Sequence, residues 1–213
     1  LGCDKNLADS EEMLGLLTGN GHEIVDSEEE ADAIVINTCC FIHDAKEESV
    51  NTILEMAEYK KTGTCKILIV TGCMAQRYKE EITEEIPEVD AVLGTTSYGD
   101  IVKALNEAEV GHVFREFKDI NALPEDSGRR VITTGGHFGY LKIAEGCDKH
   151  CTYCIIPSLR GKFRSVPEER LLKQAEYMAS QGVRELILVA QETTVYGTDL
   201  YGKKTLHILL KKL

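Results

Sequence analysis

The chain has 213 residues, of which 43% are hydrophobic and 28% are charged, and its formal net charge is -12. This composition suits a folded protein of one large or two small domains, and no apolar run approaches the roughly 20 residues that a membrane span needs. Nucleic-acid binding depends on Lys and Arg replacing counterions, so the acidic balance argues against a surface that holds phosphate backbones and favours a basic protein partner.

The first half of the chain alternates short apolar runs with amphipathic stretches, which is the βα pattern of an open parallel sheet. A helix is expected to begin at Asp9-Ser10 and to end at the glycines around Asn20, and Leu1-Gly2-Cys3 resembles the end of a strand. A second helix is expected over 45–59. Buried strands are expected at residues 33–37, 66–70 and 91–93. The pattern predicts a Rossmann-like α/β domain over 1–118.

The periodicity fades over 119–136, which contains Pro124 and the pair Gly135-Gly136 and is predicted to be a linker. A second domain is expected over 137–213. It has strands at 140–143 and 185–189, separated by a helix that Ser165 caps and Gly182 ends. A (β/α) barrel begins in this way, with its chemistry on the loops after the strands, and about two βα units are present.

Three cysteines with the spacing C-x3-C-x2-C follow the first strand of the second domain: Cys147, Cys151 and Cys154. Three thiolates on one short loop can hold three irons of a [4Fe-4S] cube and leave the fourth iron open to a small molecule. A zinc site is the alternative, because His150 lies inside the motif. His150 is adjacent to Cys151, however, so a tetrahedral site would demand a strained chelate.

Three other cysteines, Cys3, Cys39 and Cys73, recur at nearly equal intervals in the first domain. Cys39 and Cys73 fall just after predicted parallel strands, whose carboxyl ends meet at one edge of a sheet. These thiolates could hold a second cluster, but free cysteine is also a common small buried residue, and the spacing leaves both interpretations open. Cys40 is expected to pack in the interior. Cys65 is expected to be an inert residue at a strand edge, and a resolving or sensing thiol is the alternative.

Several segments resemble the radical S-adenosylmethionine (SAM) methylthiotransferases. The motif Cys147-Asp-Lys-His-Cys151-Thr-Tyr-Cys154 matches the radical SAM motif of that family. The amino-terminal domain of the family is matched by Leu1-Gly-Cys-Asp-Lys-Asn6, by Ile36-Asn-Thr-Cys39 and by Thr71-Gly-Cys-Met-Ala-Gln-Arg-Tyr78. The resemblance implies two [4Fe-4S] clusters, a radical SAM cluster on Cys147, Cys151 and Cys154 and an auxiliary, sulfur-carrying cluster on Cys3, Cys39 and Cys73.

The resemblance also implies how SAM is held and used. Tyr153 is expected against the adenine, and Gln191 and Glu192 near the amino group, for which a carboxylate is a physically suitable partner. An exposed acid at a strand end is the alternative for Glu192. One SAM is expected to donate a methyl group and a second to give a 5'-deoxyadenosyl radical, so that a C–SCH3 bond forms at the β-carbon of an aspartate.

The substrate implied by the resemblance is ribosomal protein S-twelve (uS12). Gly2-Cys-Asp-Lys-Asn6 and Gln191-Glu-Thr-Thr-Val-Tyr-Gly197 resemble the branch of the family that modifies this basic protein (RimO-type), and an acidic enzyme would attract it. An electron donor and a sulfur source are further expected partners. The alternatives are a transfer-RNA adenosine methylthiotransferase and, from another class, an iron-sulfur protein that only transfers electrons.

Two further expectations concern the surface and the ends of the chain. Lys142, Arg160, Lys162 and Arg164 form a basic group near the cysteine loop, which either faces substrate or is a solvated surface. The eight cysteines, without a secretory segment, favour reduced thiolates in the cytoplasm. Leu1 is not an initiator methionine and a helix is expected up to the last residue, so the chain is interpreted as an inactive fragment of a longer transferase.

Overall fold

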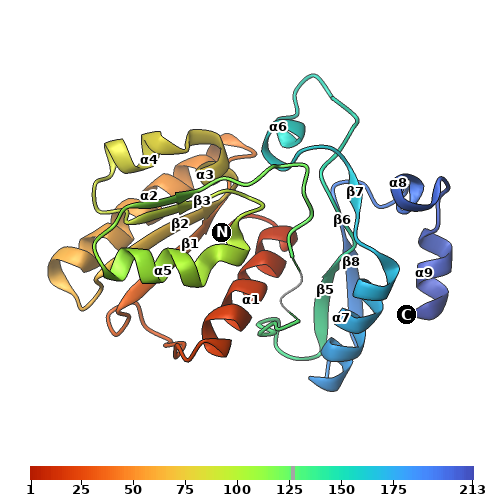
Figure 1. The fold of residues 1–213 in the computed structure, drawn as a ribbon, viewed down its shortest axis with the longest axis horizontal. Helices are drawn as coiled ribbons and strands as arrows, with labels where there is room; N and C mark the ends of the chain where they lie inside the picture. Colours follow the sequence, from red (N-terminus) through yellow and green to blue (C-terminus); the bar gives the residue numbers. More distant parts are fainter. Residues whose placement is uncertain (126–127) are drawn as a thin grey trace.

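Two parallel sheets lie side by side in the computed structural model, which describes residues 1–125 and 128–213 (Figure 1). The first sheet has the strand order β1-β2-β3-β4, and every neighbouring pair is parallel. Its strands are β1 (Ala33–Thr38), β2 (Ile67–Gly72), β3 (Ala91–Leu93) and β4 (Phe114–Glu116). The predicted open parallel sheet is confirmed, and β4 is a strand that the sequence pattern did not indicate.

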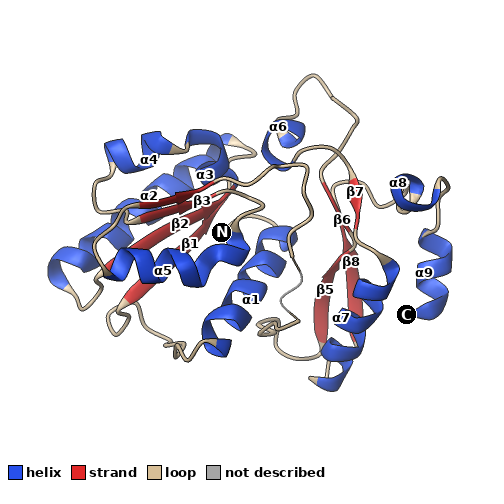
Figure 2. Ribbon diagram, viewed as in Figure 1, coloured by secondary structure: helices blue, strands red, loops and turns tan. Residues whose placement is uncertain are grey.

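Helices cover both faces of this sheet (Figure 2). One face carries α2 (His43–Thr62), α3 (Cys73–Tyr78) and α4 (Glu80–Glu85). The other face carries α1 (Asp4–Gly19) and α5 (Ile101–Glu109), which follows the short 3-10 helix η1 (Tyr98–Asp100). None of the helices in the described part of the chain is long and apolar enough to cross a membrane.

The central strand β2 contributes apolar side chains to the cores on both faces of the sheet, where the helices pack. All six of its residues are buried. Leu68 and Val70 point into the core beneath α2, whereas Ile67 and Ile69 point into the core shared with α1 and α5. Each such side chain contributes about 1.5–3 kcal/mol when fully buried. An unbroken apolar run is therefore what a parallel strand covered on both faces requires.

The second unit contains the parallel pair β5 (Phe138–Lys142) and β8 (Glu185–Val189), with α7 (Glu168–Ser180) between them in the chain. A short antiparallel pair, β6 (Ala144–Glu145) and β7 (Arg164–Ser165), extends it. Its core contains Leu141, Ile143, Leu171 and Met178 and is closed by Leu209 of α9. The remaining helices are α6 (Ile156–Arg160), α8 (Thr198–Tyr201) and α9 (Leu206–Lys212).

Two expectations about helix starts are wrong. The first helix begins at Asp4, not at Asp9, and residues 1–3 form no strand. Asp9 resembles a capping residue in the sequence, but it lies in the middle of the helical segment. Its carboxylate is buried and contacts cations of the second unit. Ser165 does not cap α7, because its hydroxyl donates to Asp199 Oδ1 at 2.6 Å and the helix begins only after Pro167.

Candidate functional site

The cysteines of the first triad come from three separate elements. Cys3 immediately precedes α1, Cys39 follows β1, and Cys73 opens α3 directly after β2. Because Thr38 pairs with Gly72 in parallel register, Cys39 and Cys73 leave the sheet at the same edge. Burial raises the pKa of Cys73, and the nearby thiols of Cys39 and Cys3 raise it further. Gly2, the residue before Cys3, lies against Cys39, since a Cβ atom at Gly2 would be 2.7 Å from Cys39 Cβ. The fold therefore brings the three cysteines to one edge of the first unit.

A glycine is required immediately before Cys73. Gly72 has φ 93°, a conformation that side chains other than glycine rarely adopt. A Cβ atom at this position would lie 2.4 Å from Asn37 Oδ1 and 2.5 Å from the Thr38 carbonyl oxygen. The close approach of β1 and β2 at this point thus sets the direction in which Cys73 leaves the sheet.

Substituting Gly72→Ala is expected to lower the free energy of unfolding by about 2–4 kcal/mol, because it combines backbone strain with overpacking against β1. Urea unfolding followed by circular dichroism measures the loss. The matched control is Gly99→Ala, since a Cβ atom at Gly99 meets nothing within 4 Å. A loss for Gly72→Ala no larger than that of the control would contradict the assignment of strain to this turn.

The two remaining cysteines of the first unit, Cys40 and Cys65, are buried, and interior packing is what the sequence predicts for Cys40. Cys40 belongs to the core beneath α2, and burial raises the pKa of its thiol to about 11. Cys65 is buried before β2, its Sγ lies 3.3 Å from the Ile67 carbonyl oxygen, and burial raises the pKa of its thiol. High thiol pKa values are typical of inert cysteines.

The second triad lies on a loop that begins after β6 and is held at several points. The Cys147 amide donates to the Gly161 carbonyl oxygen at 3.1 Å, and the Cys154 amide donates to the Cys151 carbonyl oxygen at 2.9 Å. Asp148 Oδ1 accepts from the Phe163 amide at 3.0 Å. Cys151 is exposed and the other two thiols are partly exposed, so the loop presents its cysteines toward solvent on a fixed backbone.

The donor set fits the two clusters that the sequence predicts. Within residues 1–125 and 128–213, no three Cys, His, Asp or Glu side chains surround a point that could hold a single metal ion. In a cubane, by contrast, each thiolate binds a different iron, so the ligands are spread around the cube. Each unit supplies three free cysteines, which is the number of ligands that a cubane with one open iron requires.

The residues expected to contact SAM lie at the same edge of the second unit as the cysteine loop. Gln191 and Glu192 follow β8, which pairs in parallel with the strand that leads to the loop. The Lys149 ammonium of the loop contacts the Glu192 carboxylate. Hydrogen bonds from Lys149 and Thr194 lower the pKa of Glu192 to about 2. The Glu192 side chain is 11% exposed and is paired with the Lys149 ammonium of the loop.

Two observations indicate room for a ligand at this edge. Gln191 Oε1 and Nε2 are buried, and neither has a hydrogen-bond partner in the described part of the chain. A buried amide without a hydrogen-bond partner is suited to pair with a polar group of a bound molecule. Tyr153 is 84% exposed, so its ring does not pack beneath the loop. The contacts of these residues with SAM remain predictions.

The basic group near the cysteine loop is not a surface patch. Two of its members neither face substrate nor lie on a solvated surface, so both interpretations are wrong for them. Lys142 and Arg160 are buried, and only Lys162 is well exposed. Arg164 is partly buried and donates to the Arg160 carbonyl oxygen at 3.0 Å. The two buried cations instead contact Asp9 of the first unit and Glu145 of their own unit, because the two units pack against each other here.

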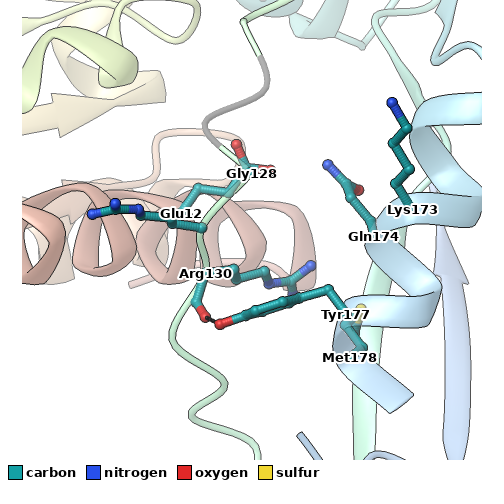
Figure 3. A pocket seen from close by; sticks show the side chains of 8 residues that line it. Glu12, Gly128, Arg130, Lys173, Gln174, Tyr177 and Met178 are labelled. Carbon is teal, nitrogen blue, oxygen red and sulfur yellow. Dashed lines mark hydrogen bonds between the residues drawn. The ribbon is translucent and has the colours of Figure 1, made fainter. Parts of the chain in front are cut away.

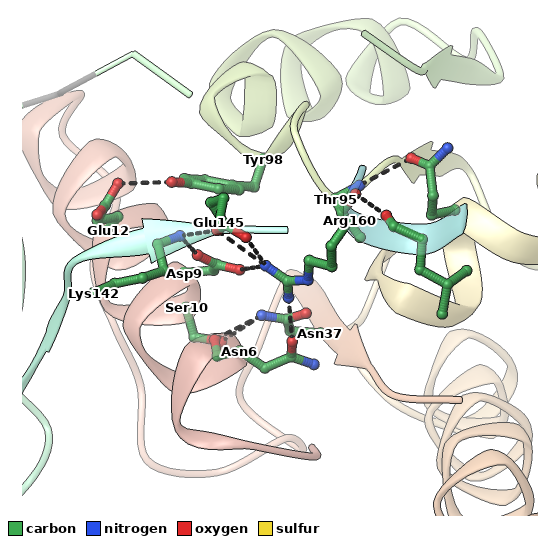
Figure 4. A network of polar contacts seen from close by, with 12 residues as sticks. Asn6, Asp9, Ser10, Glu12, Asn37, Thr95, Tyr98, Lys142, Glu145 and Arg160 are labelled. Carbon is green, nitrogen blue, oxygen red and sulfur yellow. Dashed lines mark hydrogen bonds and ion pairs between the residues drawn. The ribbon is translucent and has the colours of Figure 1, made fainter. Parts of the chain in front are cut away.

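This contact is an ionic network that we call the interdomain charge cluster, formed by Asp9, Lys142, Glu145 and Arg160 (Figure 4). Arg160 Nη1 lies 3.0 Å from Asp9 Oδ2 and 3.2 Å from Glu145 Oε1. Lys142 contacts Asp9 and lies 2.7 Å from Glu145 Oε1. Arg160 Nη2 also donates to Asn6 Oδ1 at 2.6 Å. Two anions and two cations thus satisfy one another inside the protein.

The electrostatics of the charge cluster follow from this pairing. Burial alone would raise the pKa of Glu145, but Lys142 and Arg160 lower it to about 2. Burial alone would lower the pKa of Lys142, but Asp9 and Glu145 raise it well above its usual value. Sequence reasoning missed the pairing of these residues, although the acids inside the amphipathic pattern of the first helix were the available signal.

A pocket of about 240 Å³ lies farther along the contact between the units (Figure 3). Its walls come from α1, from the segment that begins at Gly128 and from α7, and the Tyr177 hydroxyl donates to the Arg130 carbonyl oxygen at 2.7 Å. None of the predicted cluster or SAM residues lines it. It is lined by Glu12, Gly128, Arg129, Arg130, Lys173, Gln174, Tyr177 and Met178.

Two family models match successive parts of the chain, one in each unit. Residues 1–94 match the model described as "Uncharacterized protein family UPF0004", and residues 141–212 match the Radical SAM superfamily. The first match contains Cys3, Cys39 and Cys73, and the second contains the triad on the loop. Each triad therefore lies within its own family region.

Curated relatives cover the whole chain. It is 65% identical over 213 residues to a protein of Lachnoclostridium phytofermentans named "Ribosomal protein uS12 methylthiotransferase RimO". Proteins of the same name from Clostridioides difficile and Desulforamulus reducens are 52% and 50% identical. The chain spans 48% of the length of each of these relatives. With both family regions present and in this order, the chain belongs to the radical SAM methylthiotransferase family.

Proposed function

We propose that this chain forms the two cluster-binding units of a methylthiotransferase that acts on ribosomal protein uS12. The observation that carries the proposal is that each unit has three free cysteines with the predicted spacing and that a buried ionic contact joins the two units. One cluster would suffice for radical generation alone. Two open clusters suit a reaction that must both make a radical and supply sulfur.

Each unit would hold one of the two clusters. Cys147, Cys151 and Cys154 would hold the radical SAM cluster, and Cys3, Cys39 and Cys73 the auxiliary cluster. When bound, these groups and two SAM molecules supply a hydrogen-abstracting radical, a sulfur atom and a methyl group, so that an aspartate β-carbon exchanges C–H for C–SCH3. Glu192 and Gln191 would orient SAM at the end of β8, and Tyr153 would lie against its adenine.

The choice of uS12 rests on the relatives and on charge. The curated relatives carry uS12 in their name, and the chain's net charge of -12 would attract a basic protein and repel RNA. An electron-transfer protein has no use for a ligand beside its cluster, whereas Gln191 has buried polar atoms that fit one. The proposal therefore includes SAM, an electron donor, a sulfur source and a cytoplasmic location, where thiolates stay reduced.

The test is product formation by the full-length protein that contains this chain, reconstituted anaerobically. It is mixed with reductant, sulfide, methyl-deuterated SAM and either uS12 or transfer RNA. Mass spectrometry is expected to find a deuterated methylthio group on an aspartate of uS12. Product on RNA would replace the proposal with the transfer-RNA reaction. Reducible clusters without any SAM cleavage would replace it with electron transfer.

A further inference from the structure

A groove of about 340 Å³ lies between α2 and the helices α3 and α4, which cover the same face of the first sheet (Figure 2). Lys46, Val50 and Leu54 of α2 form one wall of the groove. They are spaced four residues apart, so they lie along one side of the helix over about 12 Å. Leu54 is 48% exposed although it is apolar. The groove is therefore long enough for about two turns of a bound helix.

The floor of the groove belongs to the core that contains the first cysteine triad. Met74 and Ile82 line the groove and are buried in the same core as Cys73. Met74 directly follows Cys73, and α2 begins four residues after Cys39. Both helices that form the groove therefore start at the edge of the sheet where the auxiliary cluster is proposed. A segment bound in the groove would lie beside that edge.

The second wall of the groove is acidic. Helix α4 has the sequence Glu80-Glu-Ile-Thr-Glu-Glu85, and all four of its carboxylates are exposed. Two of them, Glu81 and Glu85, line the groove. Within residues 1–125 and 128–213, no Lys, Arg or His forms an ion pair with these four carboxylates. The negative charge of this wall is therefore not neutralised by the chain's own cations.

The cations nearest the groove are held against aromatic rings. Lys46 Nζ lies 4.9 Å from the centroid of the Tyr78 ring, and the guanidinium carbon of Arg77 lies 5.3 Å from the same centroid. Lys79 Nζ lies 5.6 Å from the centroid of the Phe117 ring. These cation–π contacts hold the three positive charges away from the carboxylates of α4. An apolar floor beside an acidic wall is complementary to a segment that carries both apolar and basic side chains.

We propose that this groove is a docking site for a basic segment of the protein substrate, whose apolar side chains cover Val50 and Leu54 and whose Lys or Arg side chains pair with Glu81 and Glu85. The inference rests on the proposed function, because it takes the substrate to be a basic protein. Docking here would hold the substrate beside the first triad without contact with the reacting groups. It would therefore lower KM and leave kcat unchanged.

The experiment measures the Kd of dye-labelled uS12 for the full-length protein that contains this chain, reconstituted anaerobically, by fluorescence anisotropy at low and high salt. The double variant Glu81→Lys/Glu85→Lys is expected to weaken binding about tenfold at low salt and less at high salt, because salt screens exposed charges. Leu54→Ser is expected to weaken binding about fivefold at both salt concentrations, because the loss of apolar contact is not screened.

Helix α5 supplies matched controls, because it covers the opposite face of the sheet. Glu107→Lys/Glu109→Lys makes the same change in net charge as the double variant in the groove. Val110→Ser removes an apolar side chain that is 67% exposed just after α5. Each control is expected to change Kd less than about twofold, since it changes the overall charge or the exposed apolar surface far from the groove. Circular dichroism and an iron count establish that every variant is folded and loaded.

Two results would overturn the inference. One is a Kd in both groove variants equal to that of the parent, and the other is an equal loss of binding in the groove variants and their controls. Methylthiolation of uS12 by the parent is measured on the same samples. If the parent modifies uS12 while the groove variants bind it unchanged, the docking site is wrong and the proposed function stands. A parent that neither binds nor modifies uS12 would remove both.

Discussion

Anaerobic reconstitution is expected to give about eight irons per chain, and Cys39→Ala and Cys151→Ala are each expected to retain about four. The reason is that the two triads belong to different units, so the loss of one ligand empties one site only. Cys39 follows β1 and Cys151 lies on the loop after β6. Iron and acid-labile sulfide are measured on the same samples.

Cys40→Ala and Cys65→Ala are the controls for this experiment. Both thiols are buried, and Cys40 lies beside the first triad in the same core as Cys73. Because their thiols are interior packing groups, both variants are expected to keep about eight irons. Iron that saturates near four in the parent chain and does not change in Cys39→Ala would make the first triad a set of packing residues. The loss of a cluster in Cys40→Ala would instead make Cys40 a ligand.

Asp9→Ala is expected to lower the free energy of unfolding by about 3–5 kcal/mol, because it leaves buried cations without one of their two carboxylates. The Asp9 side chain is 4% exposed and is shared by Lys142 and Arg160. Urea unfolding followed by circular dichroism measures the change, since the chain contains no Trp. The expected loss is large because burial prevents water from replacing the lost partner.

Asp32→Ala is the matched control for Asp9→Ala. Asp32 Oδ1 lies 3.1 Å from Lys66 Nζ, but both side chains are 77% exposed. An exposed ion pair contributes little, so a loss below about 1 kcal/mol is expected. Equal losses for the two Asp variants would show that the charge cluster is not the strong contact between the units that its burial indicates.

Local patterns in the sequence were sufficient for most elements and for the grouping of the cysteines. The apolar run at 185–189 coincides with β8, and the run at 33–37 falls within β1. The run in β1 is largely buried, whereas Val189 is the one buried residue of β8 and Ile187 is exposed. Both runs lie in parallel strands, so continuous apolar character marks them without knowledge of the rest of the chain. The loop triad was equally visible, because its members are close in sequence and any fold would keep them close.

The tertiary structure decided which distant charges meet. In the sequence, Arg160 belongs to a group of basic residues that resembles a surface, and Asp9 resembles the cap of a helix. In the fold, the two are buried partners, 3.0 Å apart. No local period encodes a contact between residues so far apart in the chain, because it depends on how the two units dock. The sequence by itself therefore determined most of the strands, the spacing of the cysteines and the family, whereas docking decided the charge cluster that joins the two units.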